Sequence, residues 1–139
     1  MYQEPFTGAT LFSILVAALA PIVIGYIWYH PSIFGARWMR HSRITPELAD
    51  QAKRRMLLQV SAGFIASIFA ACVLYFFGTA LGVADVPGAV ALALWCWLGF
   101  TAPALLGSVI WEQRSLHIYL INASYWLVVL IVMALIVLI

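Results

Sequence analysis

Four long apolar segments, separated by short polar stretches, constrain this chain more than any other feature of its sequence. They cover residues 9–29, 56–81, 89–111 and 116–139. A helix of about 20 residues is ~30 Å long, which matches the hydrocarbon core of a bilayer. Hydrophobic residues make up 65% of the chain and charged residues 9%. A soluble chain of 139 residues cannot bury that much apolar surface, so lipid must cover the remainder.

The segments predict an all-α fold, a polytopic membrane protein with a bundle of four transmembrane helices in one domain over residues 1–139. A short cytoplasmic interfacial segment is expected between the first two helices, within a basic loop over residues 30–55. Pro21 and Pro103 each remove a backbone donor inside a span, so both predict a kink. Small residues at helical spacing between 62 and 82 predict close helix packing, either within the bundle or between subunits.

Cationic side chains are concentrated in the loop after the first apolar segment. Six of the seven lysine and arginine residues lie there: Arg37, Arg40, Arg43, Lys53, Arg54 and Arg55. Basic loops stay on the cytoplasmic side, so we expect this loop inside and both termini on the opposite side. Each cation near an anionic leaflet contributes ~1 kcal/mol of attraction. The charge therefore predicts contact with anionic lipids and none with nucleic acid.

The first part of this loop predicts an elbow that lies on the membrane surface. A proline after His30 takes that residue out of helical geometry. Aromatic residues then stand beside the arginines, as expected of interfacial anchors. The elbow residues are His30, Pro31, Phe34, Gly35 and Trp38.

Local patterns also indicate where two of the helices begin. Thr45 suits an N-cap and Pro46 the first helical position, and we expect this helix to run unbroken into the second span. Ahead of the first span, residues 2–7 hold no basic segment of the kind that begins a signal peptide. We therefore expect the first span to be retained.

Polar and aromatic side chains gather at one depth, in the inner third of the bilayer. The set comprises Tyr26, Trp28, Ser61, Thr101, Tyr119, Asn122 and Trp126. Asn122 is the most polar residue deep in any span, and Tyr119 and Trp126 share its face of the last helix. One interpretation is an interhelical hydrogen bond that fixes packing, worth ~0.6 kcal/mol on average. The other interpretation is a polar pocket that contacts a ligand.

No arrangement of residues predicts catalysis, a metal site or a cofactor. The cytoplasmic side holds three histidines and one glutamate: His30, His41, His117 and Glu112. Their spacing does not match a metal motif. An enzyme would require these residues to converge, so the sequence leans against one without excluding it. Cys72 and Cys96 lie inside apolar spans, where most cysteines are packing residues, so no disulfide framework is expected.

Three stretches resemble a bacterial family of small membrane proteins, catalogued as domain of unknown function seventeen sixty-one. They are Trp28-Tyr29-His30-Pro31-Ser32-Ile33-Phe34-Gly35 with Trp38, Gly99-Phe100 with Leu106-Gly107-Ser108 and Glu112, and Leu120-Ile121-Asn122-Ala123-Ser124-Tyr125-Trp126. The resemblance implies four transmembrane helices in a bacterial membrane, and it marks the elbow and Asn122 as family features. It implies no activity, substrate or catalytic residue. We expect Asn122 to satisfy backbone groups that the elbow or Pro103 leaves free.

Two classes of function stay open. The sequence favours a non-catalytic structural, binding or accessory subunit of the bacterial cytoplasmic membrane, which oligomerises or packs on a partner. The alternative is a small transporter, channel or lipid-binding protein that uses the polar layer within an oligomer. The expected partners are membrane lipids, together with a second copy or a larger membrane complex.

Overall fold

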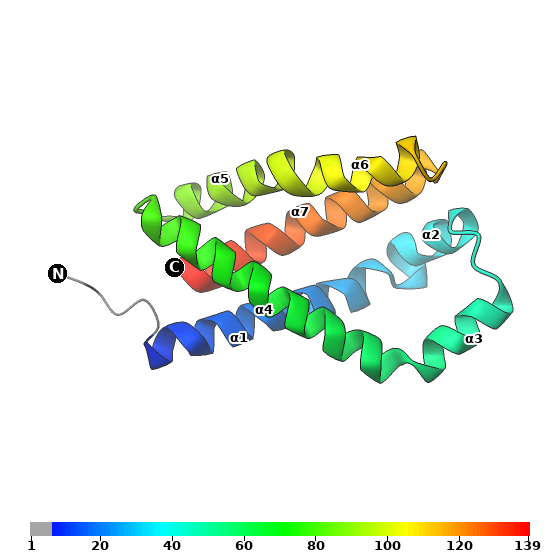
Figure 1. Cartoon of the computed structure of the whole chain (residues 1–139), viewed down its shortest axis with the longest axis horizontal. Helices are drawn as coiled ribbons and strands as arrows, with labels where there is room; N and C mark the ends of the chain where they lie inside the picture. Colours follow the sequence, from blue (N-terminus) through cyan, green and yellow to red (C-terminus); the bar gives the residue numbers. More distant parts are fainter. Residues whose placement is uncertain (1–6) are drawn as a thin grey trace.

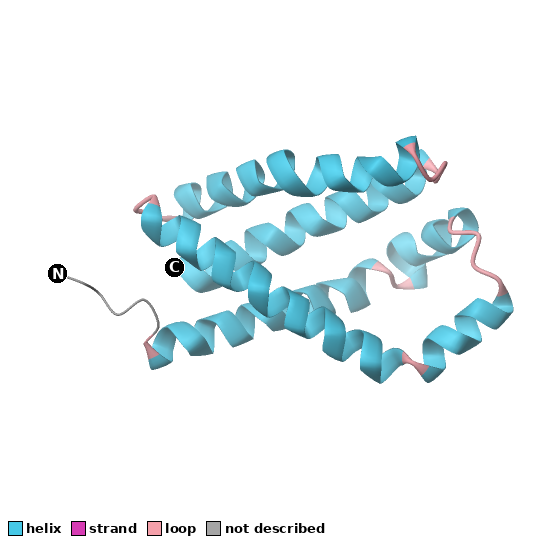
Figure 2. Cartoon of the chain, viewed as in Figure 1, coloured by secondary structure: helices cyan, strands magenta, loops and turns pink. Residues whose placement is uncertain are grey.

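The computed structural model describes residues 7–139, and helices joined by short turns make up this part of the chain. No strand occurs among these residues (Figure 2), which confirms the all-α fold class. Residues 1–6, on which the expectation of a retained first span partly depends, lie outside the described residues.

Four helices are long and apolar enough to cross a membrane, which makes this a multi-pass membrane protein by length and composition. They are α1 (Gly8–Trp28), α4 (Met56–Ala80), the composite of α5 (Val86–Cys96), η2 (Trp97–Thr101) and α6 (Ala102–Ile110), and α7 (Leu116–Leu138). Together they form the predicted bundle of four helices (Figure 1).

Side-chain oxygens cap the helices at the points where the chain enters them. Thr7 accepts from the Thr10 amide at 3.2 Å, and Asp85 accepts from the Gly88 amide at 2.9 Å. The Thr45 hydroxyl accepts from the Leu48 amide at 3.3 Å, as predicted, at the start of α3 (Pro46–Arg54). Each cap satisfies one of the backbone donors that a helix start leaves free.

The core of the bundle surrounds α7, which is the most buried of the four long helices. The helices α1, α4, α5 and α6 all contact it. Its Val129 and Met133 are fully buried, and alanines on the facing helices, Ala17, Ala71 and Ala93, are fully buried against this region. Such small residues allow close approach of helix backbones, which is the main source of packing energy between helices in lipid.

The helix α4 crosses α1 obliquely, and only its second half belongs to the core (Figure 1). Ser67, Ala71, Leu74 and Gly78 are buried there. An added Cβ at Gly78 would collide with the Leu138 side chain, so this glycine serves packing within the bundle. The first half of α4, residues 56–66, is exposed apart from one half-buried phenylalanine.

The prediction of one unbroken helix from Thr45 into the second span is wrong. α3 ends at Arg54, and α4 begins at Met56 after a turn at Arg55 with φ −104° and ψ 8°. The Arg55 amide donates to both the Gln51 and Ala52 carbonyls, at 3.2 and 3.1 Å, which tightens the last turn of α3. The break changes the direction of the chain, so α3 does not continue the line of α4 (Figure 1).

The two prolines predicted to kink their spans have different effects. α1 continues through Pro21 as one helix. Near Pro103 the helix instead widens into the π-helical turn η2, in which the Ala102 amide donates to the Trp97 carbonyl five residues back. Such a turn inserts one extra residue and reorients the side chains around it.

The elbow after α1 is a second π-helical turn, η1 (Pro31–Gly35), followed by the short helix α2 (Ala36–His41). His30 is extended, and its Nδ1 accepts from the Ser32 amide at 3.2 Å. The Gly35 amide donates to the His30 carbonyl at 3.0 Å. An added Cβ on Gly35 would overlap the Tyr29 carbonyl oxygen and lie 2.8 Å from two backbone carbons. Only glycine fits this position.

We expect Gly35→Ala to destabilise the protein by about 1–3 kcal/mol, the cost of overpacking against atoms that cannot move aside. Thermal unfolding in mild detergent measures the effect. Gly99→Ala is the matched control, because an added Cβ there meets no atom within 4 Å. Equal Tm values for the two variants would show that the elbow tolerates a side chain at Gly35.

Candidate functional site

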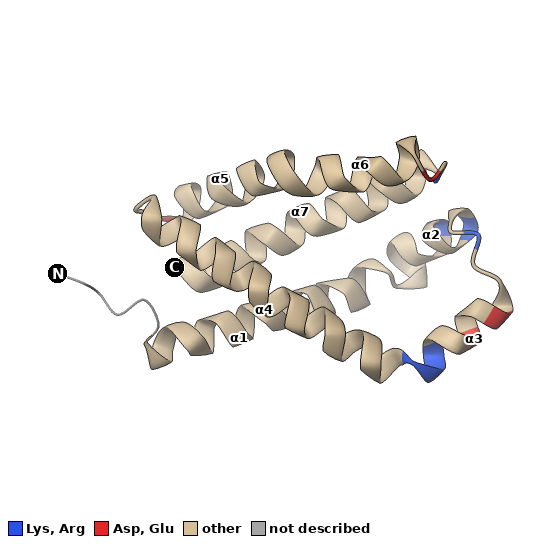
Figure 3. Cartoon of the chain, in the orientation of Figure 1, with Lys and Arg blue, Asp and Glu red and all other residues tan. Residues whose placement is uncertain are grey.

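Polar and aromatic side chains meet inside the bundle at its basic end. We use this name for the end where α1 finishes, α7 begins and most arginines lie (Figure 3). Ionisable and polar side chains are costly in hydrocarbon, so a cluster of them at a helix end marks a candidate site.

Three side chains from two segments, the end of α1 and η2, donate to three successive residues of α7. The Trp28 Nε1 donates to the Ile121 carbonyl at 3.2 Å, and the Trp97 Nε1 donates to the Ala123 carbonyl at 2.7 Å. Between them, the Tyr29 hydroxyl donates to Asn122 Oδ1 at 2.8 Å. Asn122 therefore satisfies a side-chain donor at the end of α1, and the expectation that it satisfies free backbone groups is wrong.

An aromatic cluster surrounds these hydrogen bonds. The Tyr125 hydroxyl donates to the Pro21 carbonyl at 2.7 Å, and its ring centroid lies 5.3 Å from that of Tyr29. A Cβ at Gly25 would lie 3.3 Å from the Tyr125 hydroxyl oxygen, so the glycine makes room for this contact. Trp38 meets the edge of Tyr29 at 5.7 Å, which extends the cluster from α1 into α2.

A polar cavity of about 390 Å³ lies between α2, α6 and α7. It is lined by Trp38, Ser42, Ile44, Leu105, Ser108, Glu112, Arg114, Ile118 and Asn122. The Trp38 Nε1 is buried and has no hydrogen-bond partner among the described residues. No described residue accepts from the Asn122 amide nitrogen either. Two neutral donors are therefore available beside the cavity.

The remaining polar groups of this cavity are largely committed. The Ser42 and Ser108 hydroxyls donate to the Met39 and Leu105 carbonyls, at 3.1 and 2.8 Å, which leaves their oxygens as acceptors. Glu112 and Arg114 form an exposed ion pair at 3.7 Å, so their charges cancel. Such exposed pairs contribute little to stability. The cavity suits a small polar molecule without net charge.

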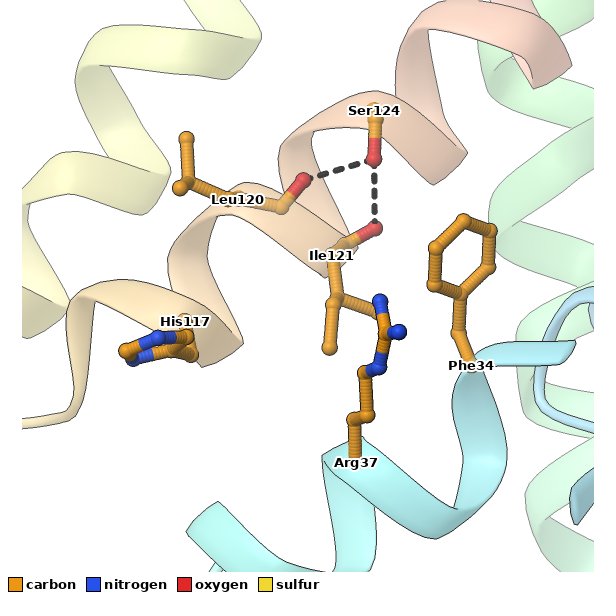
Figure 4. Close-up of a pocket in the computed structure, with 6 residues that line it drawn as sticks. All are labelled: Phe34, Arg37, His117, Leu120, Ile121 and Ser124. Carbon is orange, nitrogen blue, oxygen red and sulfur yellow. Dashed lines mark hydrogen bonds between the residues drawn. The ribbon is translucent and has the colours of Figure 1, made fainter.

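A second cavity, of about 240 Å³, lies on different faces of α2 and α7. We call it the Arg37 cavity; its lining residues are Phe34, Arg37, His117, Leu120, Ile121 and Ser124 (Figure 4). The Ser124 hydroxyl donates inward to the Leu120 and Ile121 carbonyls, at 2.6 and 3.1 Å. The His117 ring stacks on the ring of His41 with centroids 4.5 Å apart and planes 2° from parallel.

The predicted polar layer is not one site. Asn122 and Trp28 join the hydrogen-bonded cluster, and Trp126 packs beside it with its ring 5.4 Å from Tyr125. Tyr119 is half-buried on α7. Three members lie elsewhere: Tyr26 is 81% exposed, Ser61 is exposed on the first half of α4, and Thr101 lines a separate apolar groove between α4 and η2. The splay of α4 removes Ser61 from the layer.

The predicted elbow residues and loop cations also lie in different places, and only some of them line a cavity described above. His30, Pro31, Phe34 and Gly35 form the turn, and Trp38 lies in the polar cavity. All six loop cations are exposed, and Arg37 among them lines one of the two cavities described above; the other five are Arg40, Arg43, Lys53, Arg54 and Arg55. Tyr29, Ser42 and Ser108 were not predicted as site residues, although Tyr29 and Ser108 belong to the stretches that resemble the family.

The histidines converge only in part. His41 and His117 stack, whereas His30 is in the elbow and Glu112 lines the other cavity. Among the described residues, no group of three or more histidine, cysteine, aspartate or glutamate side chains could hold a metal ion. Cys72 and Cys96 are both free thiols that pack against the core.

We expect Tyr29→Phe and Asn122→Ala each to lower the free energy of unfolding, because each removes one side of the same hydrogen bond. The double variant should lose less than the sum, with a coupling of about 0.6–1.7 kcal/mol, the range for such bonds in a membrane protein. Thermal unfolding in detergent measures the cycle. Tyr26→Phe is the control, since its hydroxyl is exposed. Strict additivity would contradict the bond.

Comparison with known proteins identifies a family that matches this chain. The family model described as "Protein of unknown function (DUF1761)" matches residues 12–138, nearly the whole chain, and confirms the resemblance of the three stretches. No curated protein matches the chain, and no solved structure matches it. The chain therefore belongs to the family described as Protein of unknown function (DUF1761).

Proposed function

We propose that this protein is a non-catalytic subunit of the bacterial cytoplasmic membrane that acts by association, through the first half of α4. In this proposal residues 1–139 form one transmembrane domain, which binds a second copy of the same chain. The observation that carries the proposal is the exposure of residues 56–66 in a helix whose second half is tightly packed.

The exposed half of α4 has the surface expected of a helix contact in lipid. Ala62, Gly63 and Ala66 are exposed at helical spacing, and a Cβ added at Gly63 would meet no atom within 4 Å. Small residues of this kind let a second helix approach closely. Ser67, Ala71 and Gly78 already serve this purpose within the bundle, so the same row of small residues continues onto the open half.

One of two polar side chains on the same half supports association over simple lipid contact. Gln59 and Ser61 are exposed, and no described residue hydrogen-bonds to either side chain. Polar groups of this type stabilise helix pairs in membranes by hydrogen bonds across the contact. A second copy of α4 would supply a partner for Gln59, which lies on the face of Ala62, Gly63 and Ala66, whereas Ser61 lies on the opposite face.

The orientation follows from the charges. Arg37, Arg40 and Arg43 in α2 and its following turn, and the three cations around the α3–α4 break, all lie at the basic end. We propose that this end faces the cytoplasm and both termini the opposite side, because basic loops are retained inside.

We expect native mass spectrometry in mild detergent to find a dimer, and Gly63→Leu to shift it to monomer because the larger side chain separates the helices. Gly99→Leu is the matched control, since Gly99 is also exposed with no atom near its Cβ position. A monomer in the unmodified protein, or equal loss of dimer in both variants, would refute self-association through α4. Co-purification of a larger unrelated protein would assign α4 to that partner instead.

The polar cavity favours a second candidate, a small transporter, channel or lipid-binding role. Its two available donors, the Trp38 indole and the Asn122 amide, lie where a small polar solute would compensate them. A buried donor without a partner costs about 1–3 kcal/mol, so an occupant that accepts from Trp38 gains that amount on binding.

We expect Trp38→Phe to abolish retention of any small polar molecule seen by native mass spectrometry, because it removes the donor and keeps an aromatic ring. Trp95→Phe should leave retention unchanged, since Trp95 is 71% exposed on another helix. If Trp38→Phe raises Tm and no retained mass is found in either protein, the cavity has no solute and the second candidate fails.

A further inference from the structure

We infer that the Arg37 cavity is a binding site for one anionic phospholipid, with the phosphate on the Arg37 guanidinium and an acyl chain along the apolar face of α7. This site is separate from the exposed half of α4, so it does not depend on how the protein associates. It makes the expected contact of the six loop cations with anionic lipids specific, because it assigns a single lipid to Arg37.

The charge of the cavity is positive and uncompensated. No carboxylate lines it. Within residues 7–139 the one ion pair joins Glu112 to Arg114, and these two residues line the polar cavity on the other side of α2. The Arg37 guanidinium lies between Phe34 and Ile121 (Figure 4), so it is held at a protein surface. A guanidinium in such a place favours a phosphate, which it can bind in a bidentate manner.

The cavity also contains a second donor group. His117 lines the same cavity, and its stacking on His41 fixes the plane of its ring. The imidazole can donate to a phosphate oxygen from the edge of that plane. Arg37 belongs to α2 and His117 to α7, so the two groups that would bind the phosphate lie on helices that contact each other.

The rest of the lining is largely apolar, and this favours an amphiphile over a soluble anion as the occupant of the cavity. Leu120 is 56% exposed, and Phe34 and Ile121 complete the wall. Ser124 directs its proton to backbone carbonyls, so it does not donate into the cavity. A free anion would use only the cationic part, whereas a phospholipid would use the cation and also pack its acyl chain on the apolar wall.

The remaining cations lack this combination. Arg40 is exposed one turn further along α2 and lines none of the cavities described above. It has the same charge, and it belongs to the same short helix. Arg40→Gln is therefore the matched control for Arg37→Gln. Each substitution removes one positive charge, so both weaken the general attraction to an anionic surface by the same amount.

The test is native mass spectrometry of the full chain reconstituted with phosphatidylglycerol, phosphatidylcholine and diacylglycerol in equal amounts. We expect one retained phosphatidylglycerol, and a loss of at least about tenfold in its affinity in Arg37→Gln, the effect of one charge-assisted hydrogen bond. Arg40→Gln should retain the lipid. Leu120→Ser is a second variant, which removes part of the apolar wall at an exposed position and should also weaken retention.

Three results would overturn the inference. Equal loss in Arg37→Gln and Arg40→Gln would mean diffuse attraction, and equal retention of phosphatidylcholine would mean that the net negative charge is not recognised. Displacement by glycerol phosphate at the affinity of the lipid would assign the site to a soluble anion. The same spectra report subunit number, so failure of the lipid site and failure of α4 association are read separately.

Discussion

The structure depends on the hydrogen bonds that α7 accepts over one turn. In hydrocarbon there is no water to satisfy an indole or phenol, so each such group must find an acceptor within the protein. Trp28, Tyr29 and Trp97 find theirs at residues 121–123 of α7. Because Trp28 and Trp97 belong to different spans, this turn joins the first and third transmembrane segments to the last. Small residues at the other helix contacts then allow the helix backbones to approach closely.

The two π-helical turns are placed where they serve this arrangement. η2 begins at Trp97, so the widened turn directs the indole at the Ala123 carbonyl. η1 begins two residues after Tyr29 and leads into α2, in which Trp38 contacts the ring of the same tyrosine. In both cases a local departure from α-helical geometry positions an aromatic donor. The cavities on either side of α2 exist because this helix is held across α7 at its aromatic residues.

Much of the fold could be predicted from the sequence, because apolar length and capping chemistry are local properties. The four long helices and the Thr45 cap needed no knowledge of distant contacts. The break at Arg55 could not be predicted, since neither glycine nor proline stands there. Asn122 could be selected as a polar residue in a deep position, but its partner Tyr29 is 93 residues away and no spacing rule connects them. The same holds for the stacked pair His41 and His117. The special need for glycine at position 35 follows from an overlap with Tyr29 that only the folded elbow creates.

The length of α4 allows it to lean out of the bundle. α4 has 25 residues and α1 has 21, so at ~1.5 Å per residue they measure ~38 and ~32 Å. A helix longer than the hydrocarbon slab can adapt by tilting, and α4 crosses α1 obliquely (Figure 1). The span Val86–Ile110 also has 25 residues, yet it packs along α7. Length therefore permits the lean, and residues 56–66, which are exposed apart from one half-buried phenylalanine, leave α4 free to adopt it. A thinner bilayer favours a larger lean, so membrane thickness bears on the distance between α3 and the rest of the protein.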